Sequence, residues 1–141
     1  MNATLRILAG TLVLSAVLVL ASCTGMTREA RQAYLASIQV ATADLANKPD
    51  GVYNGAYTIK LPPGEAAANK SIAVAVTVKA GKIAAIAITS PRGFSSGKFY
   101  NALVTGPDGV IAKQSLDVDM VSGASYSSKV FLKAVEDALS N

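Results

Sequence analysis

The chain has 141 residues, 51% of them hydrophobic, with a formal net charge of +4, no His, no Trp and a single Cys. Without imidazole there is no Ser-His-Asp triad, no Cys-His pair and no His-ligated zinc. One Cys forms neither an internal disulfide nor a CxxC pair, so redox chemistry would require a bound cofactor. The basic residues are spread along the chain without clustering or interleaved aromatics, and we therefore expect no nucleic-acid partner.

The N-terminal segment has the pattern of a signal peptide. Arg6 precedes the apolar stretch Ile7–Leu20, which is shorter than the roughly 20 residues of a bilayer-spanning helix. Leu20–Cys23 resembles a bacterial lipobox, so we interpret residues 1–22 as a lipoprotein signal peptide cleaved before a lipidated Cys23. The alternatives are an ordinary signal peptide or an uncleaved anchor. The expected location is the cell envelope, on the extracytoplasmic side, with the protein anchored in a membrane by acyl chains.

Removing the signal peptide leaves 119 residues and a charge of +3, enough for one domain. Residues 23–49 are expected to form a tether and an N-terminal helix. Apolar residues recur there at steps of three and four, and turn-forming residues follow from residue 47. This helix should pack on its own domain, although a spacer or a dimer face is also possible. The apolar positions are Ala30, Ala33, Tyr34, Ile38, Ala41 and Leu45.

Three strands are predicted in the domain, which spans residues 50–141. Val52–Lys60 is rich in Tyr and β-branched residues, and Ser71–Lys79 alternates branched with small residues. Ala80-Gly81 forms a tight turn into Ile83–Thr89, which gives an antiparallel hairpin. The apolar residues change parity within the last strand, which indicates either a β-bulge or burial on both faces.

Helical patterns dominate the remaining chain. A short helix is predicted through Phe99–Leu103, whereas Val110–Leu116 fits either a short helix or an edge strand. A C-terminal helix should start between Ser125 and Ser128 and bury one apolar stripe. The fold class is therefore α+β: a single domain with a small antiparallel sheet and packed helices. The stripe comprises Val130, Phe131, Ala134, Val135, Ala138 and Leu139.

The most informative segment precedes that helix, between Asp119 and Ser128. Small residues there leave the backbone uncovered where free N–H groups and the positive end of the helix dipole point outward. Such a place attracts phosphate. The hydroxyls of Ser122, Ser125, Ser127 and Ser128 can donate to an anion or accept from helix N–H groups. From the residues alone, Ser125 or Ser127 is predicted to be the helix N-cap.

Four segments in order resemble the FMN-binding domain family, which includes the C subunit of sodium-pumping NADH:quinone reductase and the G subunit of the related Rnf complex. They are Asp50–Gly55, Val76–Ile83, Gln114–Asp119 and Val121–Ser125. Some family members carry FMN through a phosphoester to the last Thr of Ser-Gly-Ala-Thr, attached by a flavin transferase. Ser125 stands at that position here, and it keeps the hydroxyl but lacks the methyl group of Thr.

The resemblance implies a role for each residue around an FMN esterified to Ser125. Gly123 and Ala124 would let the phosphate approach the backbone, while the N–H groups of Ser127 and Ser128, with the helix dipole, would offset its charge. Asp119, and less directly Asp117, would hold a metal or orient the Ser125 hydroxyl while the transferase acts, or would simply form a solvated turn.

Two aromatic residues are candidates for contact with the flavin ring. Tyr53 and Tyr126 would stack on the isoalloxazine, or would belong to the core. No catalytic residue and no metal site are expected in the chain itself.

The resemblance also implies a function. The protein would be a flavin electron carrier rather than an enzyme, since the flavin supplies the redox chemistry. Its partners would be a flavin transferase and membrane redox proteins. The alternatives are a structural or ligand-binding lipoprotein without flavin, and a reversible FMN binder.

Overall fold

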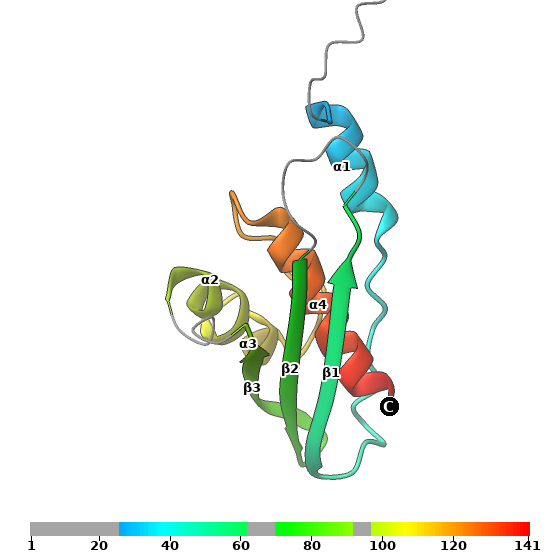
Figure 1. Ribbon diagram of the computed structural model, residues 1–141. Helices are drawn as coiled ribbons and strands as arrows, with labels where there is room; N and C mark the ends of the chain where they lie inside the picture. The colour runs from blue at the N-terminus through cyan, green and yellow to red at the C-terminus, as the bar shows by residue number, and fades with distance from the viewer. Residues whose placement is uncertain (1–25, 62–69, 92–96) are drawn as a thin grey trace, which may run out of the picture.

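The computed structural model describes residues 26–61, 70–91 and 97–141, so the predicted signal peptide and Cys23 lie outside the described residues. The described chain forms a single α+β domain, as predicted, with a three-stranded sheet packed on a long C-terminal helix (Figure 1). No helix within these ranges is both long and apolar enough to cross a membrane. The elements are α1 (Arg28–Ser37), β1 (Gly51–Ile59), β2 (Lys70–Lys79), β3 (Lys82–Ser90), α2 (Lys98–Tyr100) continuing into a π-helical turn (Asn101–Thr105), α3 (Val110–Lys113) and α4 (Ser125–Ser140).

The sheet is antiparallel in the order β1-β2-β3, and each strand lies within one residue of its predicted bounds. In β2 the branched residues face the core, because alternate residues of a strand point to opposite faces. The parity change in β3 is a β-bulge. Between the pairs Val78–Ile83 and Thr77–Ala85, β3 contains the extra residue Ala84. The bulge brings the apolar side chains on either side of it to the same buried face.

Helix α4 covers one face of the sheet, and its predicted apolar stripe is buried as expected. The closest approach is at Gly55 in the middle of β1. A Cβ atom on Gly55 would lie 2.3 Å from both the Ala134 carbonyl oxygen and the Ala138 nitrogen. The backbones of β1 and α4 are therefore in direct contact, which only glycine on the strand allows.

The predicted N-terminal helix is wrong in its extent, because α1 ends at Ser37. Residues 38–48, here called the strap, run alongside α4 without regular secondary structure. Lys129 of α4 donates to the Ile38 carbonyl at 3.0 Å, and Glu136 accepts from a further strap amide at 3.0 Å. These bonds satisfy backbone groups that a continued helix would have paired internally. The apolar strap side chains pack on the core in the extended form instead.

The segment 110–116 is helical at its start, as α3, and does not form an edge strand. The reason lies at Gln114, whose side chain accepts from the Ile83 amide at 2.7 Å and donates to the Ile83 carbonyl at 2.9 Å. The Tyr100 hydroxyl donates to the Ile86 carbonyl on the same strand. Side chains therefore occupy hydrogen-bonding groups of β3 that another strand would use.

Candidate functional site

Ser125 is the first residue of α4, and its hydroxyl takes no part in capping the helix. The N-cap is Ala124, which offers no side-chain bond. The buried Ser128 hydroxyl holds the turn, accepting from the Val121 amide at 3.1 Å and donating to the Ala124 carbonyl at 3.0 Å. The expectation that Ser125 or Ser127 caps the helix is thus wrong. In the described part of the chain, the Ser125 hydroxyl forms no hydrogen bond.

The turn before Ser125 is open, as the small residues predict. Ser122 and Gly123 are exposed, and nothing lies within 4 Å of the position of a Cβ atom on Gly123. Gly123 adopts a φ of 77°, the left-handed conformation that favours glycine. The first bond of α4 runs from the Ser128 amide to the Ala124 carbonyl, so the preceding amides lack helical acceptors.

A pocket of about 240 Å³, here called the Ser125 pocket, opens at this helix end. It gathers five predicted site residues, Gly123, Ala124, Ser125, Tyr126 and Ser127. Arg31 of α1 and Lys70 at the start of β2 also line it. Sequence reasoning missed both cations, because they lie far from Ser125 along the chain and only the packing of α1 and β2 brings them together.

Tyr126 points its ring toward α1. The ring centroid lies 6.4 Å from that of Tyr34 and 6.0 Å from the guanidinium carbon of Arg31. The Tyr126 hydroxyl lies 3.9 Å from the Met26 sulfur. Tyr126 therefore belongs to the contact between α1 and α4. This position agrees with the alternative that Tyr126 is part of the core.

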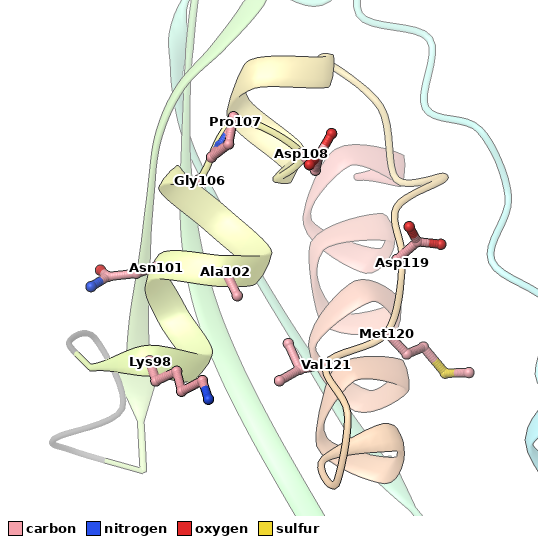
Figure 2. A pocket seen from close by; sticks show the side chains of 9 residues that line it. All are labelled: Lys98, Asn101, Ala102, Gly106, Pro107, Asp108, Asp119, Met120 and Val121. Carbon is pink, nitrogen blue, oxygen red and sulfur yellow. The ribbon is translucent and has the colours of Figure 1, made fainter.

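A second, larger hollow of about 840 Å³, here called the Met120 pocket, lies between the π-helical turn and the loop that leads to α4 (Figure 2). Met120 is 43% exposed at its rim. Lys98 projects from the α2 side, and Asp119 lies on the opposite loop. The lining comprises Lys98, Asn101, Ala102, Gly106, Pro107, Asp108, Asp119, Met120 and Val121. Only Ser122 separates this lining from that of the Ser125 pocket along the chain.

The two predicted carboxylates differ in position. Asp119 lines the Met120 pocket, whereas Asp117 is exposed and does not line it. The Asp117 amide donates to the Ser115 hydroxyl at 3.0 Å in a local turn. Within the described ranges, no three His, Cys, Asp or Glu side chains gather as a metal site.

Tyr53 lies away from the other predicted residues. Its hydroxyl donates to the Pro49 carbonyl at 2.8 Å, and the Lys48 ammonium lies 4.1 Å from the ring centroid. Lys48 also donates to the Leu139 carbonyl at 2.8 Å, near the C-terminal end of α4. The helical rise places Leu139 about 21 Å along the axis from Ser125. We therefore correct the prediction that Tyr53 stacks on a flavin at Ser125.

The fold and the site define a small α+β domain with an anion-attracting helix end beside a cavity of ligand size. The chain matches the FMN-binding domain over residues 68–140, a range that includes Ser125 and every residue of the Met120 pocket. It therefore belongs to the FMN-binding domain family. No curated protein and no solved structure matches it.

The residues present fit FMN. Ligand pockets commonly measure about 300 to 1,000 Å³, so the Met120 pocket is large enough for a flavin ring and the Ser125 pocket only for a phosphate end. Lys98 supplies a hydrogen-bond donor to the larger cavity, and Val121, which faces it across the cavity in Figure 2, supplies apolar surface. The Met120 pocket thus offers a polar side chain and an apolar surface to the flavin ring.

Proposed function

We propose that this protein is an extracytoplasmic flavin electron carrier, anchored to a membrane through Cys23, with FMN esterified to Ser125. One observation carries the proposal. In a chain of this family, the half-buried Ser125 hydroxyl forms no hydrogen bond within the described residues and lines a phosphate-sized pocket at the start of α4. The bound FMN would supply the electron transfer, since the chain has no His and a single Cys.

The ester requires an activated donor and a second protein. Ser125 Oγ would bond to the flavin phosphorus of a flavin dinucleotide, whose pyrophosphate bond breaks and releases a nucleoside monophosphate. The hydroxyl proton must leave to a base. The described residues that line the Ser125 pocket include no carboxylate, and the chain has no imidazole, which supports a separate flavin transferase as the source of that base. Asp119, in the neighbouring hollow, would orient the serine or hold a metal while the transferase acts.

Flavin attachment is tested by producing the full chain with and without an active flavin transferase. Denatured protein is then examined for in-gel flavin fluorescence. We expect fluorescence only with the transferase, its loss in Ser125→Ala and its retention in the matched control Ser127→Ala. Ser125→Thr restores the residue typical of the family and should load at least as fast. Flavin released on denaturation would instead indicate reversible binding, and a colourless protein would indicate a structural role.

The anchor is tested separately at Cys23, which lies outside the described residues. Metabolic labelling with a radioactive or clickable fatty acid should mark the wild type and leave Cys23→Ser unlabelled. The label should follow the membrane fraction. Labelling that persists in Cys23→Ser would contradict the proposed lipid site without affecting the proposed flavin site.

A further inference from the structure

We infer that Arg31 and Lys70 recognise the phosphate end of FMN, so that α1, which lies outside the matched range 68–140, helps to determine which flavin the domain binds. This inference rests on the proposed function and adds two positioning residues to the same site. Both side chains line the Ser125 pocket together with the residues of the serine-rich turn. They come from two elements that are distant in the chain, α1 and β2.

The size of the pocket decides which part of the cofactor it fits. At about 240 Å³, it lies below the usual range for a whole drug-sized ligand and well above the roughly 30 Å³ of one water molecule. A phosphoryl group with a few waters fits such a volume, whereas the whole cofactor does not. The pocket is thus suited to the charged end of the flavin.

The charges around the Ser125 pocket also favour the phosphate end of the flavin. Arg31 and Lys70 each carry one positive charge, and the N-terminus of α4 adds about half a charge. Among the described residues that line the pocket, none is acidic. A phosphate monoester carries about −1.5 to −2 near neutral pH, so these positive groups attract it. Riboflavin has no phosphate, so it would gain nothing here.

Arg31 contacts an aromatic ring of the site, and Lys70 starts a paired strand. The Arg31 guanidinium lies 6.0 Å from the centroid of the Tyr126 ring, a cation-π geometry one residue away from Ser125. The Tyr34 hydroxyl donates a hydrogen bond to the Lys60 carbonyl, which fixes α1 to the end of β1. Lys70 is paired with Ile59 in the sheet, which fixes its backbone.

The test uses the full chain carrying Ser125→Ala, which cannot form the ester, and compares binding of FMN with binding of riboflavin by flavin fluorescence quenching. We expect tighter binding of FMN, with a preference that weakens as salt rises. Arg31→Gln and Lys70→Gln should each weaken FMN binding about tenfold and leave riboflavin binding unchanged. Arg31→Lys should recover part of the loss, which a purely structural role of Arg31 would not predict.

The matched control is Lys82→Gln, an exposed lysine at the far hairpin end of the sheet, which should change neither affinity. Equal affinities for FMN and riboflavin, an absence of FMN binding, or unchanged FMN binding in Arg31→Gln and Lys70→Gln would each overturn the inference. The ester at Ser125 is scored independently by in-gel fluorescence. A protein that prefers FMN but never carries the ester would refute the proposed covalent function and leave the phosphate site standing.

Discussion

The backbone of Gly55 on β1 touches the backbone of Ala138 on α4 so closely that a Cβ atom on the glycine would lie 2.3 Å from the Ala138 nitrogen. This contact fixes the distance between the sheet and the helix whose N-terminus carries Ser125. The position of the candidate site relative to β2 and Lys70 therefore depends on a glycine far from the site itself.

Gly55→Ala should lower the free energy of unfolding by about 3 kcal/mol, because neither backbone can move away without opening the core. Urea denaturation followed by circular dichroism measures this change. The control is Gly51→Ala on the same strand, where a Cβ atom would meet only the Tyr53 ring at 3.6 Å, an ordinary contact. A loss of similar size in both variants would contradict the close-approach argument.

Ser128→Ala should destabilise the protein by about 1 to 3 kcal/mol, since it leaves the Val121 amide without its acceptor in a buried turn. Ser127 is only partly buried and caps nothing, so Ser127→Ala should change the unfolding free energy by less than about 0.5 kcal/mol. Thermal and chemical unfolding of the two variants provide the comparison. Equal effects would show that the turn is not held by the Ser128 hydroxyl.

Asp119→Asn should slow flavin attachment without altering stability, because the side chain is exposed, lines the Met120 pocket and is the carboxylate proposed to act on Ser125. We expect the initial rate of fluorescence gain with the transferase to fall about tenfold or more. Asp117→Asn removes an equal charge away from the pocket and should keep the wild-type rate. A fall of the same size in both would indicate a general charge effect on the encounter with the transferase.

Stability should decrease at alkaline pH partly through Tyr100. Burial raises the pKa of its phenol above the ordinary value of 10.0, because the charged form is disfavoured in the folded state. As pH rises, the phenol therefore loses its proton in the unfolded chain first. The stabilisation that Tyr100 contributes to the folded state is complete below pH 10 and is lost as pH rises through the pKa of the folded state. Urea midpoints measured from pH 9 upward should fall more steeply for the wild type than for Tyr100→Phe. Parallel slopes would refute this contribution.

The hairpin and the apolar stripe of α4 could be predicted because periods of two and of 3.6 residues are local signals. The irregular alternation of apolar residues in β3 allowed two interpretations, a β-bulge or burial on both faces, and the structure has the bulge, at Ala84. The strap could not be predicted, because apolar spacing from Ile38 onward fits a helix as well as an extended segment. Hydrogen bonds from α4, among them that of Lys129, decide in favour of the extended form.

The candidate site was predictable only where it is contiguous in sequence. Gly123 to Ser127 form one turn and one helix start, and the structure keeps them together. Tyr53 was misassigned because its strand begins at the opposite end of α4. Arg31 and Lys70 were missed because nothing local marks a cation that another element will bring beside a serine.

The contact between Met26 and Tyr126 has a consequence for how the protein would sit in the cell envelope. Met26 lies 3.9 Å from the Tyr126 hydroxyl, and three residues of extended chain span at most about 11 Å from Cys23. If Cys23 carries the proposed acyl chains, this short spacing keeps the end of the domain that carries Ser125 close to the bilayer surface.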